Sequence, residues 1–194
     1  MIRTSLKLVT AATANLISTA DAKTHLQVDF ADATQNTYID SLCLTAQQIV
    51  ENYCNLKLTA STWDFYLTDF PARGIVLPFS PIASITSIKY YDSTNTLQTV
   101  STSDYWYSIY ENPCKIEAET WPGVYDDRTD AVQVRFVTGY TSPDACPDAL
   151  KTAILLLLRD LYDNKGNQVK ERMETWQVIA YPYRVFHSTM DNTR

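Results

Sequence analysis

The sequence contains unusually little glycine. Four of its 194 residues are glycine, whereas glycine makes up about 7% of ordinary proteins. No two of them lie close enough to form a Gly-x-Gly-x-x-Gly loop, a Walker phosphate loop or a Gly-x-Ser-x-Gly turn. This shortage excludes the standard glycine-rich nucleotide sites and the hydrolases built on that turn.

Residue types that catalyse reactions or bind metals are also scarce or scattered. The two histidines, His25 and His187, lie near opposite ends of the chain, which argues against a histidine-rich metal site. His25 has no nucleophile nearby in the sequence, and we interpret it as a residue on a helix face. The segment 126–130 is acidic but lacks the alternating ligands and the glycine of a calcium loop. We therefore expect no enzymatic activity, no cofactor and no metal.

The four cysteines form no Cys-x-x-Cys motif. Cys43 and Cys54 are predicted to share one helix, and eleven residues of helix advance by about 16 Å, which is beyond disulfide reach. All four are expected to be reduced thiols in a cytosolic protein. Cys114 is interpreted as a small buried apolar residue rather than a nucleophile.

Basic runs and long apolar runs are missing as well. The formal net charge is −6, and the 16 Lys and Arg residues are scattered singly. Tight binding to a nucleic-acid backbone normally requires a basic stripe, so we expect none. The longest apolar run, Ala153–Leu158, is too short to cross a bilayer, so no membrane association is expected.

Helical periodicity is present at both ends of the sequence. Ser18 followed by Asp21 has capping-box spacing and predicts a short helix that continues through Leu26. The segment from Ile39 to Tyr53 places apolar residues on one stripe with a 3.6-residue period. A third stripe begins after Pro147, which suits a first helical turn, and stops near residues 164–166.

The central residues instead alternate with a period of two. Residues 63–67, 82–91 and 132–136 have the alternation or β-branched content of strands, and Asp92–Asn95 is a predicted turn before a returning strand at 97–100. We expect about 80 residues of antiparallel sheet with the connectivity of a meander. The aromatic residues of this block fit either a sheet core or a contact between subunits, and both remain open.

These patterns predict an α+β fold, in which a discontinuous helical bundle has a central antiparallel β insert and an extended C-terminal tail. The expected divisions are an N-terminal arm with core helices (1–58), the β insert (59–142), a core helix (143–166) and an assembly tail (167–194).

Several local motifs, in this order, resemble the head–tail connector (adaptor) proteins of long-tailed bacteriophages. Leu16–Leu26 is similar to the family's opening helix, which ends in Glu-Ala-Lys-x-His-Leu, although Asp21 stands where Glu is usual. Ala46–Tyr53 resembles its Ala-x-x-x-Val-Glu-x-Tyr pattern, and Thr62-Trp63 resembles the strand that opens its β insert. Further similar segments are Leu77–Tyr90, Tyr105, Trp121-Pro122, Val134–Tyr140, Pro147–Tyr162 and Pro182–Arg184.

The resemblance implies a structural protein without catalytic activity. Such a protein assembles in the host cytoplasm into a ring of copies of itself, with twelve the expected number. In the virion the ring docks on the portal protein at the neck, between capsid and tail. It extends the DNA channel, through which DNA passes without tight binding, and it receives a downstream tail or stopper protein.

The C-terminal tail is the segment that we expect to contact a partner. It gathers large apolar residues around a proline that disfavours a regular helix or central strand. The residues predicted to bind the portal or a neighbouring subunit are Trp176, Ile179, Tyr181, Pro182, Tyr183, Arg184 and Phe186. The alternative hypothesis is a monomeric β-rich binding module, for example one that binds carbohydrate.

Overall fold

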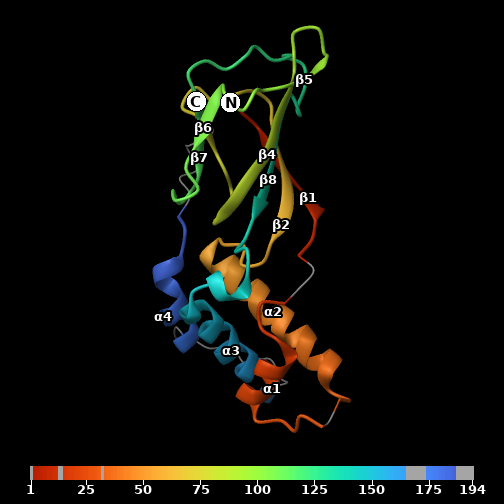
Figure 1. Cartoon of the computed structure of the whole chain (residues 1–194), viewed down its shortest axis with the longest axis vertical. Helices are drawn as coiled ribbons and strands as arrows, with labels where there is room; N and C mark the ends of the chain where they lie inside the picture. Colours follow the sequence, from red (N-terminus) through yellow and green to blue (C-terminus); the bar gives the residue numbers. More distant parts are fainter. Residues whose placement is uncertain (1, 13–14, 32, 165–173, 187–194) are drawn as a thin grey trace. The chain divides into compact units, whose positions relative to one another are not determined.

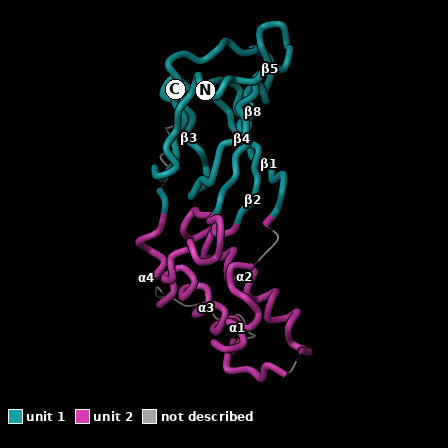
Figure 2. The backbone as a smooth tube through the Cα atoms, in the orientation of Figure 1, with its two compact units in different colours: residues 1–11, 60–139, 185–194 teal, residues 12–59, 140–184 magenta. Residues whose placement is uncertain are grey.

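The computed structural model describes residues 2–12, 15–31, 33–164 and 174–186 (Figure 1). The chain divides into two compact units, shown in Figure 2. The β unit comprises residues 1–11, 60–139 and 185–194, and the helical unit comprises residues 12–59 and 140–184. Helices and antiparallel sheets are both present, so the α+β prediction is confirmed.

The helical unit contains four α-helices and two short 3-10 turns among its described residues. The elements are α1 (Thr19–Leu26), α2 (Asn36–Cys54), η1 (Pro143–Ala145), α3 (Asp148–Asp163), α4 (Thr175–Ala180) and η2 (Tyr181–Tyr183). The predicted cap of α1 is confirmed, because the Ser18 side chain accepts a hydrogen bond from the Asp21 backbone N–H at 3.1 Å. This bond satisfies one of the backbone donors left free at a helix start.

The apolar stripes of α2 and α3 form the core of the helical unit. The buried residues of α2 include Ile39, Ala46 and Val50, and those of α3 include Leu150 and Ile154. Helix α3 packs against both α2 and α4. The 3.6-residue periods therefore predicted the two long helices, but not the whole buried face of α2, where Gln47 and Glu51 are also buried and Ile49 is exposed.

Two buried polar side chains on α2 form hydrogen bonds with the segments that precede and follow this helix. Gln47 accepts a hydrogen bond from the Leu16 backbone N–H at 3.0 Å, and Glu51 accepts one from the Leu58 N–H at 3.0 Å. Lys57 lies 3.4 Å from the Glu51 carboxylate. The buried charge of Glu51 is thus paired and hydrogen-bonded, as burial of a carboxylate requires.

The described residues of the β unit form two sheets. The five-stranded sheet has the order β1-β2-β8-β4-β5, and the three-stranded sheet has the order β3-β7-β6. The strands are β1 (Thr4–Thr10), β2 (Ser61–Leu67), β3 (Ile75–Val76), β4 (Ile82–Tyr91), β5 (Leu97–Thr99), β6 (Tyr105–Tyr107), β7 (Lys115–Ala118) and β8 (Val132–Thr138). Side chains from both sheets form one buried cluster, which includes Phe65, Ile88, Ile116, Val134 and Phe136.

The strand pairing confirms one local prediction and corrects a wider one. Strands β4 and β5 form the predicted hairpin, with Tyr90 opposite Gln98. The meander prediction is wrong, because β8 lies between β2 and β4 and pairs with both. Alternation along a strand indicates which face is buried, but it does not identify a partner strand far away in the sequence.

The N-terminal segment also differs from the expected division. We placed residues 1–58 with the helical core, but β1 pairs antiparallel with β2, from Thr4 opposite Leu67 to Thr10 opposite Thr62. The first eleven residues consequently belong to the β unit. The alternation of Leu6 and Leu8 is typical of an extended segment, but it does not indicate which sheet that segment joins.

None of the described helices is both long enough and apolar enough to cross a membrane.

Candidate interaction surfaces

The groups that we considered for chemistry are placed in unreactive settings. All four cysteines are free and buried. Burial raises the pKa of each thiol to about 11, as for Cys114 in the β unit and Cys54 in the helical unit. Since the thiolate is the nucleophilic form, these residues are poor nucleophiles at neutral pH.

An arginine within the acidic segment 126–130 pairs with one of its carboxylates. The Arg128 guanidinium donates to both carboxylate oxygens of Asp130, at 3.0 and 2.9 Å, and lies 3.5 Å from the centre of the Tyr91 ring. It also donates to Asn95 at 3.1 Å. Within the described parts of the chain, no group of three His, Cys, Asp or Glu residues is arranged to hold a metal ion.

The polar face of the five-stranded sheet carries a cross-strand ion pair. Arg135 on β8 donates two hydrogen bonds to Asp64 on β2, at 2.7 and 2.8 Å. These bonds lower the pKa of the Asp64 carboxyl below its usual range. Asp64 is buried, so the bidentate pair neutralises a charge that water does not reach.

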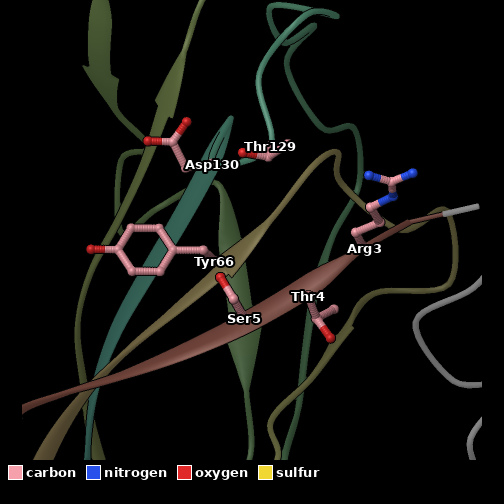
Figure 3. Close-up of a pocket in the computed structure, with 6 residues that line it drawn as sticks. All are labelled: Arg3, Thr4, Ser5, Tyr66, Thr129 and Asp130. Carbon is pink, nitrogen blue, oxygen red and sulfur yellow. The ribbon is translucent and has the colours of Figure 1, made fainter.

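An open hollow lies on the same unit, beside this face. Its lining is Arg3, Thr4, Ser5, Tyr66, Thr129 and Asp130, with a volume of about 580 Å³ (Figure 3). The figure shows these side chains coming from β1 and the residue before it, from β2, and from the loop before β8. Its acidic group is already held by Arg128, and the lining contains no nucleophile–base pair. The hollow offers no constellation of the kind that supports catalysis.

The C-terminal residues predicted to bind a partner are divided between core and surface. Trp176 on α4 is 7% exposed, and its ring meets Tyr53 of α2 edge-to-face at 5.3 Å. Its indole N–H donates to Glu174 at 2.7 Å, and Glu174 and Gln177 form a capping box. The Ala180 carbonyl accepts a hydrogen bond from the Cys54 thiol at 3.5 Å.

This packing corrects the expectation of an extended tail over residues 167–194. Helix α4 packs on its own chain, because the Trp176 ring meets Tyr53 and α4 packs against α3. Of the other predicted residues, Tyr181, Pro182 and Phe186 are exposed, whereas Ile179, Tyr183 and Arg184 are half-buried. The Arg184 guanidinium lies 4.6 Å from the Tyr53 ring centre. Residues 165–173 and 187–194 lie outside the described part of the chain.

Strand β1 is exposed along its whole length. It is an outer strand of the five-stranded sheet, and all seven of its residues are exposed. Leu6, Leu8 and Val9 are each 40% exposed or more, and Lys7 is the charged residue of the strand. We call residues 3–9 the β1 edge.

A second exposed apolar surface surrounds β6, an outer strand of the three-stranded sheet. Trp106 is 54% exposed and Tyr110 is 88% exposed, and Tyr107 and Ile109 also reach the surface. We call residues 105–111 the aromatic edge. The sequence did not reveal which aromatic residues stay uncovered here, since that depends on β6 being the outer strand of its sheet.

Comparisons with known proteins identify the fold. Neither sequence-family profiles nor curated protein sequences give a match. Solved structures do match. A chain from the neck of an empty GTA particle, computed with C6 symmetry, has a TM-score of 0.79 at 19% identity, over 95% of this chain and 97% of the other.

Two further solved structures agree. A chain in the virion of a native gene transfer agent (GTA) particle has a TM-score of 0.80 at 20% identity, over 94% of this chain and 96% of the other. A chain in the neck of a native GTA particle, computed with C12 symmetry, has a TM-score of 0.74 at 20% identity, over 95% of this chain and 97% of the other. The fold of this chain is therefore one also found in particle necks.

Proposed function

We propose that this chain is a structural subunit of the neck of a virus-type particle, a head–tail connector (adaptor). In this role, copies of the chain assemble in the host cytoplasm as a ring of twelve on the portal protein. The ring extends the DNA channel and offers an attachment surface to a downstream tail or stopper protein. The observation that supports this proposal is the similarity over 94–95% of the chain to chains in GTA necks and virions.

The chemistry of the described residues supports a structural role rather than a catalytic one. The thiols are buried and have pKa values raised to about 11. In the 126–130 loop, Arg128 pairs with the Asp130 carboxylate, which is therefore not free to bind a cation. The net charge of −6 suits a channel through which DNA slides, because a basic lining would retain the phosphate backbone.

The portal contact that we propose involves the exposed part of the C-terminal segment. Tyr181 and Phe186 are 51% and 66% exposed, and Val178 on α4 is 59% exposed. Aromatic residues are enriched in protein interfaces, and these side chains are available without unfolding α4. Trp176 is assigned to holding α4 in place rather than to direct contact.

Co-expression with the portal protein encoded in the same genome tests this function. We expect the purified complex to show a ring of this chain stacked on the portal in electron micrographs. Mass measurement should give about twelve copies, and DNA binding at physiological salt should be weak. A triple variant, Val178→Ala, Tyr181→Ala and Phe186→Ala, should remain folded and lose the portal.

The proposal fails if the chain stays monomeric with the portal and is absent from purified particles. A monomer that binds glycans instead would favour the alternative of a carbohydrate-binding module. A matched control for the triple variant is Leu44→Ala on α2, which removes an apolar side chain that is 44% exposed at a different surface. If Leu44→Ala lost the portal equally, the C-terminal contact would be wrong.

A further inference from the structure

The β unit has two exposed apolar edges, and they differ in charge. The β1 edge contains the cations Arg3 and Lys7 and no carboxylate, and both side chains are exposed. The aromatic edge ends at the exposed Glu111 and is flanked by Asp104 and Glu119, which are also exposed. Glu117 opposes Trp106 across the β6–β7 ladder and forms an ion pair with Lys115, so the acidic character of this edge comes from Asp104, Glu111 and Glu119.

The two edges lie on different sheets and on opposite flanks of the β unit. Strand β1 ends the five-stranded sheet, and β6 ends the three-stranded sheet. Figure 1 shows β1 along one flank and β6 along the other. Within the part of the chain that the structure describes, β1 pairs with β2 alone and β6 with β7 alone, so each strand has one side without a ladder partner.

We propose that the β1 edge of one copy docks against the aromatic edge of the next copy. This inference rests on the proposed ring function and assigns the surfaces that build the ring. A ring needs a head-to-tail contact between two different surfaces of the same chain, and repeating that contact around an axis closes it.

Each edge offers what the other lacks. Leu6, Leu8 and Val9 present aliphatic side chains, and Trp106, Tyr107 and Tyr110 present aromatic ones. Burying both sets removes apolar surface from water and places aromatic residues at the centre of the interface, where they are enriched. The cations of one edge then meet the carboxylates of the other, and this complementarity fixes the direction of docking.

The ladder edges add to the same contact. An outer strand with one charged residue and no proline is open to pairing with another chain, and natural proteins usually block such strands. Addition of a strand across the interface would satisfy backbone groups that otherwise face water. The β1 edge is unblocked because, in the assembled ring, the neighbouring copy covers it.

The main test exchanges the charges of the two edges. One variant carries Arg3→Glu and Lys7→Glu, which makes both of its edges acidic. The other carries Glu111→Lys and Glu119→Lys, which leaves both of its edges largely basic. Each variant alone, co-expressed with the portal, should lose at least about 90% of the rings at physiological salt. Mixing the two variants should restore rings, because an even-numbered ring can alternate them.

A second arm tests the apolar contact with a matched control. Leu8→Asp places a charge on β1 at a residue that is 44% exposed, and Leu97→Asp does the same on β5, at the other edge of the sheet, where the residue is 48% exposed. Both monomers should keep the melting temperature of the wild type within a few degrees. We expect Leu8→Asp to abolish rings and Leu97→Asp to leave them intact.

Cross-linking supplies an independent measurement. The four native cysteines are buried, so a Leu8→Cys, Trp106→Cys double variant adds two reactive exposed thiols. Oxidation of its assembled rings should give a ladder of covalent multimers. A Leu97→Cys, Trp106→Cys variant should not give that ladder.

The outcomes separate the two proposals. Suppose that wild-type rings form on the portal, so that the connector function stands. The edge assignment is then overturned if both charge variants also form rings alone. It is equally overturned if mixing the two variants restores no rings. Loss of rings in Leu97→Asp to the same extent as in Leu8→Asp would also overturn it. If the wild type forms no ring with the portal, the connector function itself fails.

Discussion

The two terminal segments of this chain differ in burial, and their composition does not predict the difference. The C-terminal segment is rich in large apolar residues and is predicted to be an extended tail, yet α4 buries Trp176 and Ala180. The N-terminal strand also carries apolar residues, and all seven of its residues are exposed. The comparison shows that apolar content alone does not indicate whether a segment is buried. Whether a terminal segment is buried depends on whether the rest of the chain has a surface that packs against it.

The covering surfaces explain the difference. Trp176 meets Tyr53 on α2 edge-to-face, and α3 packs against α4, so α4 is packed within the helical unit. Strand β1 has β2 on one side, and among the described residues no strand on the other. Four substitutions test this contrast, and we order them from the largest expected effect to the smallest.

Replacement of Trp176 with alanine should destabilise the protein strongly. Removing a buried tryptophan costs about 3–5 kcal/mol in comparable cores. For a chain of this size, this corresponds to a fall in melting temperature on the order of 10 °C. Calorimetry of Trp176→Ala measures it, with Val178→Ala, an exposed residue of the same helix, as the control. Equal and small effects from both would mean that α4 is not part of the core.

Replacement of Asp64 with asparagine should cost about 2 kcal/mol at pH 7, because it breaks charged hydrogen bonds to Arg135 within the sheet that holds β1. The pKa of Asp64 is lowered in the folded state. Its contribution is therefore complete above the unfolded pKa of about 3.9, and is lost as the pH falls through the folded value.

Urea unfolding at several pH values checks the Asp64 prediction. The difference in unfolding free energy between the wild type and Asp64→Asn should shrink below about pH 4. The control is Asp163→Asn, which removes an exposed partner of Arg159 on α3. Exposed pairs contribute about 0–1 kcal/mol, so this control should change little at any pH.

Replacement of Ser18 with alanine should cost about 1 kcal/mol, the usual effect of losing a helix cap. This residue begins the helix that follows β1 along the chain, and it accepts the Asp21 N–H at 3.1 Å. Ser18→Thr keeps a hydroxyl acceptor and should retain most of the stability. A loss in Ser18→Thr as large as that in Ser18→Ala would show that the hydroxyl is not the cause.

Replacement of Leu8 with aspartate should change the stability of the monomer by no more than about 0.5 kcal/mol, as is usual for exposed sites. Chemical denaturation of the isolated monomer provides the measurement. A loss of several kcal/mol would show that β1 contributes to the core of its own subunit, and would remove the contrast between the two termini.

The elements that the sequence predicted are those fixed by local physics. The stripes of α2 and α3 and the cap at Ser18 depend on residues within a few positions of one another. The β4–β5 hairpin is similar: Asp92 accepts hydrogen bonds from the Thr94 hydroxyl, the Gln98 side chain and the Thr96 N–H, and these lower its pKa to about 2. Such signals are readable without a partner from elsewhere in the chain.

The features that the sequence did not predict depend on distant partners. Strand β8 inserts between β2 and β4, and no local pattern distinguishes this order from a meander. Helix α4 has six residues, too few to display a period, and its burial depends on Tyr53 of α2. The exposure of Trp106 follows from the position of β6 at the end of its sheet. The candidate surfaces therefore emerged from topology rather than from motifs.

The division of the chain has a mechanical consequence. The backbone passes between the units at residues 11–12, 59–60, 139–140 and 184–185. The two units are therefore joined by four covalent connections instead of one tether. A protease that cuts one of these connections leaves three intact, so a single cut at a junction should not separate the units. Repeated passage of the chain from one unit to the other thus gives their attachment a redundancy that a single linker lacks.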